Sequence, residues 1–384
     1  MASLKSKDYH KATILQVVPS LIAGGVERGT IEMAKAIAEE QYRSLVVSSG
    51  GPLVSKVEAA GGQHINMNVD TKNPFSIFSN ICKIAALIKE QKVDIIHARS
   101  RAPAWSSYFA AKKTNIHFVT TFHGIYNFSE SFKRYYNSIM TYGERVIAVS
   151  DFVKQHILDN YDIDESIIRV IHRGVDAKYF SPDNLSEEDL DLLREKYHVP
   201  KSVPVILLPA RMTRWKGHKH LIQALNKIRE KDFYCILAGD LSKHPTYTAE
   251  IKNMIQELKL QSKVQIFGPE ADMLSLFGIS DIILSTSIEP EAFGRVIIES
   301  QSMERIVIAS NIGGAAETII DEVTGYHVEP NNPAELAEKI SFVLDNLNST
   351  TLNKIRKNAR MSSSQSFSLE TMQKKTIDVY RELL

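Results

Sequence analysis

Glu291-Ala-Phe-Gly-Arg-Val-Ile-Ile-Glu299 places two carboxylates eight positions apart, with an aromatic residue and a glycine between them. The run Asp281-Ile-Ile-Leu-Ser285 just before it is largely apolar and predicts a buried strand. Residues 286–294 are polar and rich in turn formers, and Arg295 to Met303 predicts the first turns of a helix. We therefore expect Glu291 in a loop and Glu299 on the second helical turn, so the two acids cannot share one helical face.

The junction between this loop and this helix has the chemistry of a phosphate site. Backbone N–H groups of Phe293, Gly294 and Arg295 lie at the start of the helix, and a helix N-terminus attracts anions. Glycine lets a ligand approach the backbone closely, and a carboxylate can accept two hydrogen bonds from a vicinal diol such as a ribose. The stretch thus predicts a site for a nucleotide diphosphate joined to a sugar.

A second strand upstream adds positive charge to the same site. Val205-Ile-Leu-Leu-Pro-Ala210 is a short apolar run, and Arg211-Met-Thr-Arg-Trp-Lys216-Gly217 follows it directly. Ligands of open α/β sheets bind beyond the carboxyl ends of the strands, so Arg211 and Lys216 should lie where a diphosphate would bind. Two cations there would stabilise the charge that develops as the sugar–oxygen bond breaks.

Together these stretches resemble the retaining GT-B glycosyltransferases with a Glu, seven residues, Glu signature. This is the large family of group 1 glycosyltransferases, which includes lipopolysaccharide-core and mannosyl or glucosyl transferases. The resemblance implies that Glu291 contacts the donor sugar, that Glu299 contacts the ribose, and that Arg211 and Lys216 bind the donor phosphates. Ala210 is a departure, because the family often has glycine there. Further family landmarks follow in order: Leu237-Ala-Gly239-Asp240, Phe267-Gly268, Gly313-Gly314 and Thr324-Gly325.

Strand-like runs alternate with helical patterns through both halves of the chain, which predicts an α/β protein. Its 384 residues exceed what one hydrophobic core usually organises. By resemblance we expect two doubly wound Rossmann-like domains facing across a cleft, the GT-B architecture. The expected parts are an acceptor-binding domain over residues 1–178, a nucleotide-sugar-binding domain over 179–366, and a last helix over 367–384 that returns to the first domain. Residues 177–204 interrupt this alternation and are expected to form the interdomain connection, and residues 346–366 are another polar stretch.

The N-terminal half offers two further candidate groups. Gly24-Gly25 follows the expected strand Ile14–Val18, but the third glycine of a dinucleotide fingerprint is missing. By resemblance the loop approaches the donor diphosphate and sugar, and a tight turn without a ligand is the alternative. His123 follows another expected strand, and by resemblance it lies near the reacting carbon as a second catalytic residue, with a core histidine as the alternative. For His97 we expect a core position.

Three arginines and one loop complete the candidate site. Arg99 and Arg101 follow an expected strand, and we expect them to bind the acceptor. Arg173 stands where the family usually has asparagine, which leaves two interpretations, an altered acceptor side or an ion pair with Asp176. Recognition of the nucleotide base is expected from the loop Phe267 to Glu270, through backbone groups.

The resemblance implies a retaining transfer of a hexosyl group from a nucleotide diphosphate sugar, UDP- or GDP-linked, to an acceptor hydroxyl. The donor is a co-substrate, no cofactor is expected, and no metal is needed where Arg211 and Lys216 bind the leaving phosphate. The expected acceptor is a bacterial envelope glycan or a lipopolysaccharide-core precursor. A nucleotide-sugar epimerase of the same fold and a non-catalytic nucleotide-sugar-binding module are the alternatives.

A basic and aromatic segment lies in the N-terminal half. Between residues 99 and 134, six basic residues stand against one acid, Glu130, and aromatic residues interleave them. The basic residues are Arg99, Arg101, Lys112, Lys113, Lys133 and Arg134. One explanation is a solvated face over a core. The other is contact with an anionic, lipid-linked glycan acceptor at the inner membrane face.

Composition limits the remaining classes of function. The net charge of +1 gives no global attraction to nucleic acid. Cys82 and Cys235 lie far apart in apolar runs, which indicates reduced packing residues rather than a disulfide or metal framework. The first residues lack the apolar region of a signal peptide, and no run approaches the roughly 18 apolar residues of a spanning helix. We therefore expect a cytoplasmic protein whose membrane contact is at most peripheral.

Overall fold

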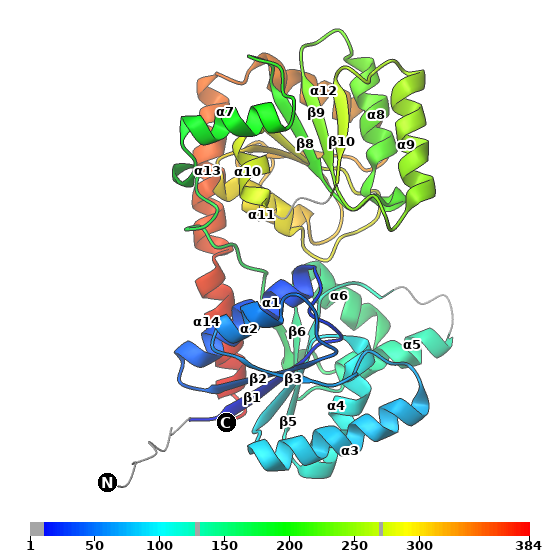
Figure 1. Ribbon diagram of the computed structural model, residues 1–384, viewed down its shortest axis with the longest axis vertical. Coiled ribbons are helices and arrows are strands. Elements are labelled where there is room, and N and C mark those ends of the chain that lie inside the picture. The colour runs from blue at the N-terminus through cyan, green and yellow to red at the C-terminus, as the bar shows by residue number, and fades with distance from the viewer. Residues whose placement is uncertain (1–10, 127–130, 269–271) are drawn as a thin grey trace. The chain divides into compact units, whose positions relative to one another are not determined.

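The computed structural model describes residues 11–126, 131–268 and 272–384, and it divides into two compact units (Figure 1). Unit 1 comprises Met1–His172 and Thr371–Leu384, and unit 2 comprises Arg173–Glu370. From the sequence we expect the domain boundaries to come directly after residues 178 and 366. Each unit is an α/β structure with its own sheet.

Unit 1 is built on a parallel sheet, which in the described residues has seven strands in the order β3-β2-β1-β4-β5-β6-β7. The strands are β1 Thr13–Val17, β2 Arg43–Ser48, β3 Gln63–Asn66, β4 Ile95–Ala98, β5 His117–Phe122, β6 Arg145–Ala148 and β7 Ile168–Val170. Strand order reverses between β1 and β4, as in a doubly wound fold. Such a switch point is where ligands of open α/β sheets bind.

Helices connect these strands. They are α1 Gly25–Glu39, α2 Val54–Ala59, α3 Pro74–Gln91, α4 Arg101–Thr114, α5 Ser131–Ser138, α6 Asp151–Asn160 and, from the far end of the chain, α14 Leu369–Arg381, with short turns η1 Ile139–Thr141 and η2 Glu165–Ile167. Helix α1 packs with α2, and α3 packs with α4. Right-handed crossovers on either side of the switch point place these two pairs on opposite faces of the sheet.

Unit 2 repeats this plan. Its parallel sheet has six strands in the described residues, in the order β10-β9-β8-β11-β12-β13. The strands are β8 Val205–Pro209, β9 Tyr234–Ala238, β10 Val264–Phe267, β11 Ile282–Ser285, β12 Ile306–Ser310 and β13 Tyr326–Val328. Here the order reverses between β8 and β11, the two strands that precede the cationic loop and the Glu291–Glu299 stretch. The predicted pair of doubly wound Rossmann-like domains is therefore confirmed.

Helices also cover this second sheet (Figure 1). They are α7 Glu187–Lys196, α8 His218–Lys227, α9 Pro245–Glu257, α10 Met273–Gly278, α11 Arg295–Ser302, α12 Pro333–Asp345 and α13 Thr350–Ser366, with short turns η3 Pro182–Asn184, η4 Arg214–Lys216 and η5 Ala316–Thr318. Helix α8 packs with α9 and α12, whereas α11 packs with α13. The polar stretch 346–366 thus contains a long helix that its composition does not reveal.

The cores lie between the sheets and these helices. Every residue of β1, β9 and β12 is buried, as expected for parallel strands covered on both faces. Cys82 is exposed, Cys235 is buried, and both are free thiols. Among the described residues, no helix combines the length and the apolar character needed to cross a bilayer.

The last helix, α14, completes the core of unit 1. Tyr380 is fully buried, and its hydroxyl is hydrogen-bonded to Nδ1 of His97 at 2.7 Å, while Nε2 of His97 is hydrogen-bonded to the Thr121 hydroxyl at 2.7 Å. Burial lowers the pKa of His97 well below its usual value, and the charge of Arg99 lowers it further. His97 is therefore a neutral core histidine with both ring nitrogens bonded, as expected from the sequence.

We predict that Tyr380→Phe lowers the free energy of unfolding by about 1–3 kcal/mol, because it leaves a buried nitrogen of His97 without a partner. Urea denaturation of the whole chain measures the change. Tyr142→Phe is the matched control, since Tyr142 is 41% exposed and its change should stay within about 0.5 kcal/mol. Equal effects of the two substitutions would contradict a stabilising role for the His97–Tyr380 bond.

Candidate functional site

The candidate site of unit 2 lies at the carboxyl edge of its sheet. Strand β8 leads into the loop that carries Arg211 and Lys216, and β11 leads into the loop that carries Glu291. The two strands are paired in parallel, with Ile282 beside Ile206 and Ile283 beside Leu207. Both loops therefore leave neighbouring strands at the switch point, where this class of sheet binds ligands.

The structure brings Lys216 and Glu291 into a direct ion pair. The distance from Lys216 Nζ to Glu291 Oε1 is 2.6 Å, and the two side chains are 14% and 15% exposed. Ser287 donates a short hydrogen bond to the same carboxylate oxygen. A pocket of 90 Å³ beside the pair is lined in part by Ala210, Gly294 and Arg295. Residues predicted from two distant stretches of sequence thus meet around one small cavity.

Backbone contacts hold the two loops against each other. Thr286 donates from its hydroxyl to the Lys216 carbonyl at 3.0 Å, and the Ile288 N–H donates to the Trp215 carbonyl at 2.7 Å. Gly217 has φ +75°, and a Cβ built on it would lie 1.9 Å from the Thr286 carbonyl oxygen. No other residue type fits there without moving the loop. Lys216 therefore has a fixed position relative to the Glu291 loop.

The backbone of Glu291 is held from its other side. Gly314 N–H donates to the Glu291 carbonyl at 2.7 Å, and Gly313, at φ +68°, would place a Cβ 2.7 Å from the same oxygen. Gly313-Gly314, one of the sequence landmarks, is thus a support for the acidic loop. The position of the Glu291 carboxylate depends on backbone packing as well as on its own ion pair.

Cations dominate the electrostatics beside this loop. Arg211 and Lys216 both lie over the Trp215 ring, with their charged groups 5.4 and 4.2 Å from its centroid. Burial lowers the pKa of Lys216, Glu291 raises it, and the neighbouring charge of Arg211 lowers it. Burial also lowers the pKa of His218 to about 4, helped by the charge of Lys216, so His218 is neutral near pH 7. Two like charges held near each other favour an anionic ligand.

The start of α11 has the geometry expected of an anion site. Gly294 precedes the helix with φ +93°. Phe293 is 4% exposed and packs edge-on against Phe367, with ring centroids 5.7 Å apart, so its side chain belongs to the core and only its backbone can serve a ligand. Arg295 Nε lies 3.6 Å from Glu299 Oε1, and the Glu299 residue is 3% exposed. Glu299 is thus deeply buried beside Arg295.

The loop expected to bind the nucleotide base lies only partly within the described residues. Phe267 ends β10 and packs edge-on against Tyr197, with ring centroids 5.0 Å apart. No described heavy atom lies within 4 Å of a Cβ built on Gly268. Pro269 and Glu270 lie outside the described residues.

Unit 1 places its candidate residues at the carboxyl edge of its own sheet. Gly24, at φ +136°, directly precedes α1, and Gly25 is the first residue of that helix. His123 follows β5, and a Cβ built on the next residue, Gly124, meets no described heavy atom within 4 Å. Space for a ligand therefore adjoins His123 within the described part of unit 1.

The three arginines expected on the acceptor side differ in exposure. Arg99 is 2% exposed and donates to the Gln16 side chain at 3.1 Å, and Arg173 is 7% exposed. Arg101 is half-buried, donates to Asn137 Oδ1 at 2.9 Å and lies 4.2 Å from the Tyr126 ring centroid. Of the three, Arg101 has the most accessible side chain. Phe128 and Glu130 of the basic and aromatic segment lie outside the described residues.

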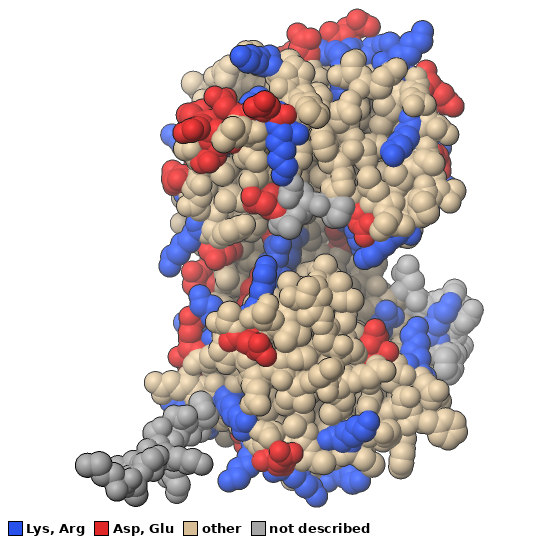
Figure 2. Space-filling model, in the orientation of Figure 1, with Lys and Arg blue, Asp and Glu red and all other residues tan. Residues whose placement is uncertain are grey.

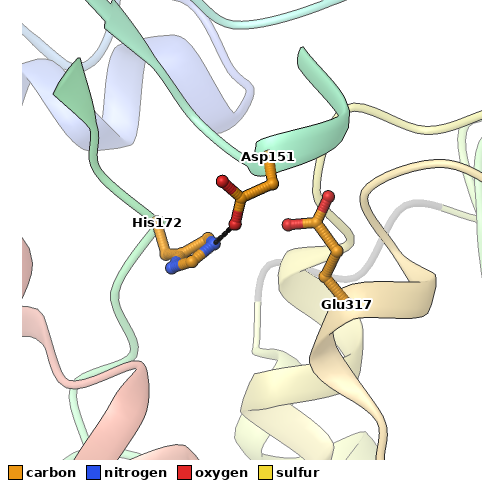
Figure 3. A group of neighbouring side chains, drawn as sticks. All are labelled: Asp151, His172 and Glu317. Atoms are coloured by element: carbon orange, nitrogen blue, oxygen red, sulfur yellow. Dashed lines mark ion pairs between the residues drawn. The ribbon is translucent and has the colours of Figure 1, made fainter. Parts of the chain in front are cut away.

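One titratable pair at the same edge of unit 1 was not expected. His172 follows β7 and its Nε2 lies 3.8 Å from the carboxylate of Asp151, the first residue of α6 (Figure 3). Glu317, also drawn there, belongs to unit 2. Ser287 and Trp215 in unit 2 were likewise not singled out. The only sequence signal for these two residues is that they lie in the two predicted loops. No characteristic spacing links a serine to a carboxylate or a tryptophan to a lysine.

Two glycosyltransferase family models match parts of this chain. Residues 189–362 match the family model described as glycosyl transferases group 1, and residues 23–179 match the model described as glycosyltransferase family 4. The two matches fall largely in unit 2 and unit 1, respectively.

The chain is also similar to individual proteins. A crystal structure of a glycosyltransferase from Rickettsia africae ESF-5 is 54% identical, covers 98% of this chain and 99% of its own, and superposes with a TM-score of 0.92. Anabaena HepE in complex with UDP-glucose is 25% identical over 97% of this chain and 100% of its own, with a TM-score of 0.85. The GPI3 subunit of phosphatidylinositol N-acetylglucosaminyltransferase from Saccharomyces cerevisiae is 24% identical over 80% of this chain and 67% of its own.

Proposed function

Since the chain belongs to the group 1 glycosyltransferases and has the GT-B fold, we propose that it transfers a hexosyl group from a UDP- or GDP-linked sugar to an acceptor hydroxyl, with retention at the anomeric carbon. The observation that carries the proposal is the Lys216–Glu291 ion pair at 2.6 Å beside the start of α11. This pair places two groups beside one pocket: a cation that can bind phosphate, and a carboxylate that can accept hydrogen bonds from sugar hydroxyls. HepE, which was solved with UDP-glucose, supports a nucleotide-sugar donor.

In this proposal unit 2 holds the donor. Lys216 and Arg211 bind the diphosphate together with the backbone N–H groups of Phe293, Gly294 and Arg295. Glu291 accepts hydrogen bonds from the transferred sugar, and Glu299 reaches the ribose. Glu299 is 3% exposed, so its contact with a ribose requires a neighbouring side chain to move. Backbone groups after Phe267 bind the base.

The proposed reaction needs few protein groups. The bond between the anomeric carbon and the diphosphate oxygen breaks, and the acceptor oxygen bonds to that carbon from the same face. The departing phosphate takes the acceptor proton, while Lys216 and Arg211 stabilise its charge. No cofactor takes part in this scheme.

We propose that the reaction is metal-independent. Cations of the protein lie beside the proposed phosphate site, where a metal ion would otherwise act. The sequence contains two Asp-x-Asp triplets, Asp162-Ile-Asp164 and Asp189-Leu-Asp191, a motif that can hold metal. In the structure Asp164 accepts from the Ser166 N–H, and Asp189 is part of the capping box of α7. Both triplets thus take part in helix capping.

Unit 1 contributes the acceptor side in this proposal. Gly24 and Gly25 let the backbone approach the donor sugar, His123 serves the reacting carbon, and Arg101 meets the acceptor. Arg99, and Arg173 at the start of unit 2, are too buried to reach an acceptor themselves, so we assign them to holding the loops that follow β4 and β7.

The proposed acceptor is an anionic or lipid-linked glycan, such as a bacterial envelope glycan or a lipopolysaccharide-core precursor. The exposed cations Lys112, Lys113, Lys133 and Arg134 support it, and so does the yeast relative, which is named for phosphatidylinositol. The same proposal includes peripheral contact with the inner face of a membrane. The protein is otherwise cytoplasmic and does not bind nucleic acid.

A donor panel tests the function. Ligand that binds only the folded state raises the melting temperature, by an amount that corresponds to about 2.7 kcal/mol at a hundredfold excess over Kd. We expect UDP- or GDP-hexoses to raise the melting temperature of the wild-type protein and to release nucleoside diphosphate when an acceptor extract is added. A panel without any shift or turnover would contradict the proposed function.

The same assay separates the two alternatives. An epimerase would convert the nucleotide sugar without an acceptor, and chromatography of the donor after incubation would detect the product. A non-catalytic module would show the thermal shift without nucleotide release under any acceptor condition. The ion-paired Glu291 and Lys216 favour an enzyme over a non-catalytic module, whereas an epimerase would use the same diphosphate site.

A further inference from the structure

Helix α3 has apolar side chains on two opposite faces. One face belongs to the core, where Ile84 and Ile88 are 0% and 2% exposed. The other face carries Phe75 and Phe78, which are 87% and 69% exposed and lie one turn apart on the same side of the helix. Large exposed apolar groups that gather on one face indicate contact with another surface.

The charges around this face are mainly positive. Lys72, Lys83 and Lys89 are exposed, and the exposed acids Asp70 and Glu90 lie only at the two ends of this segment. A partner that only buried the phenylalanines would gain nothing from these lysines. An apolar face with an excess of lysines beside it fits an anionic surface that also accepts aromatic rings.

Helix α4 packs along α3 and carries exposed residues of the same two kinds. Phe109 is 43% exposed, and Lys112 and Lys113 are exposed beside it. Trp105 stacks on Phe109 with ring centroids 6.2 Å apart, and it contacts Tyr135 with centroids 5.4 Å apart. Figure 2 shows the face of unit 1 crossed by α3 as mainly uncharged, with blue and some red side chains beside it.

We define the α3 surface as the exposed phenylalanines and lysines of these two helices: Phe75, Phe78, Phe109, Lys72, Lys83, Lys89, Lys112 and Lys113. It shares Lys112 and Lys113 with the basic segment singled out in the sequence. Its two most exposed phenylalanines lie outside that segment, so the surface emerges only from the structure.

A second copy of this chain would be a poor partner for the α3 surface. A twofold interface would place two identical sets of lysines against each other, and like charges across an interface repel. An anionic bilayer suits both parts of the surface. Phenylalanine rings enter the interface between headgroups and acyl chains, and lysine ammonium groups stay at the level of the phosphates.

We propose that the α3 surface docks the protein on an anionic lipid bilayer. Phe75 and Phe78 lie in the first two turns of α3, and in a parallel sheet that end of the helix lies at the carboxyl edge, where Arg101 and His123 also lie. Docking through this surface would bring the bilayer next to the sheet edge that would receive a lipid-linked acceptor. This role in acceptor delivery rests on the proposed function.

Vesicle sedimentation of the full chain tests the proposal. The vesicles are phosphatidylcholine alone and phosphatidylcholine with about 30% phosphatidylglycerol, at ionic strengths of about 0.01 M and about 1 M, where the Debye length falls from about 30 Å to about 3 Å. We expect binding to the anionic vesicles that weakens at high salt. Phe75→Ser with Phe78→Ser should reduce partitioning at least about tenfold, and Lys83→Gln with Lys89→Gln should reduce it mainly at low salt.

The matched control is Ile320→Ser with Met361→Ser, because these unit 2 side chains are 59% and 53% exposed and should not alter partitioning. Wild-type protein that ignores anionic vesicles at low salt overturns the proposal, and so does a Phe75/Phe78 variant that binds like wild type. Self-association without lipid that the same variant abolishes would assign the face to a second copy and also overturn it.

A donor thermal shift on the same samples keeps the two proposals separate. The Phe75/Phe78 variant should keep the wild-type shift, because neither residue belongs to the donor site. A shift without vesicle binding leaves the proposed donor site intact, and it overturns both the α3 surface and the proposed membrane contact. Vesicle binding without any donor shift supports the α3 surface and contradicts the proposed function.

Discussion

Lys216→Ala and Arg211→Ala are each expected to slow glycosyl transfer by about a hundredfold or more, the usual effect of losing one preorganised partner of a developing anion. Lys216 is the more informative position. Its ammonium is 2.6 Å from Glu291 and its side chain is 14% exposed, so water cannot readily replace it beside a departing phosphate. Steady-state nucleotide release with saturating acceptor measures the effect.

Arg214→Ala is the control for both substitutions. Arg214 lies on the same turn, η4, but its side chain is 66% exposed and pairs with Glu250 at 2.6 Å, so its removal should leave turnover nearly unchanged. Removing one partner of a poorly exposed ion pair can also destabilise a protein, and a melting temperature for each variant separates this effect from catalysis. Near wild-type turnover in both Lys216→Ala and Arg211→Ala would end the donor-site assignment.

Glu291→Gln and Glu299→Gln should affect different kinetic constants. We expect Glu291→Gln to lower kcat by about a hundredfold, because only this side chain would touch the sugar as it approaches an oxocarbenium-like state. Glu299→Gln should raise the donor KM by about tenfold, the effect of weakening one charged hydrogen bond that ground state and transition state share. Initial rates over a range of donor concentrations measure both constants.

Glu289→Gln is the matched control for the acidic loop, because Glu289 is an exposed acid two positions before Glu291. It should leave kcat and KM unchanged. A lowered kcat in Glu299→Gln together with a raised KM in Glu291→Gln would reverse the assigned roles and contradict the division between them.

Much of unit 2 could be predicted from the sequence, because its strands are short apolar runs that end at chemically distinctive loops. The runs before Arg211 and Glu291 correspond to β8 and β11, and parallel strands bring their carboxyl ends to one edge. The contact between Lys216 and Glu291 was not predicted. It depends on the pairing of β8 with β11 and on the fit of Gly217 against Thr286, and single-sequence patterns carry neither.

Helix α13 was missed for a different reason. Its residues are mostly polar, but Leu352, Ile355 and Ala359 recur at helical spacing and are 0%, 3% and 0% exposed. Such a narrow apolar stripe is hidden by the average composition of the segment. The exposure of Phe75 could not be predicted either, because apolar residues occur on both faces of α3 and periodicity does not tell which face meets the core.

Unit 1 takes its last structural element from beyond unit 2, since α14 supplies Tyr380 to the core and Gln373 donates to the Glu32 carbonyl at 2.8 Å. A ribosome therefore synthesises the sheet of unit 1 about two hundred residues before the helix that covers it. At about 5–20 residues per second this interval is about 10–40 s. Throughout this interval the core of unit 1 lacks the part that α14 completes, while unit 2 is contiguous and can fold as soon as it emerges. Chaperone demand during translation should therefore come from the first half of the chain and end only when the last helix is released.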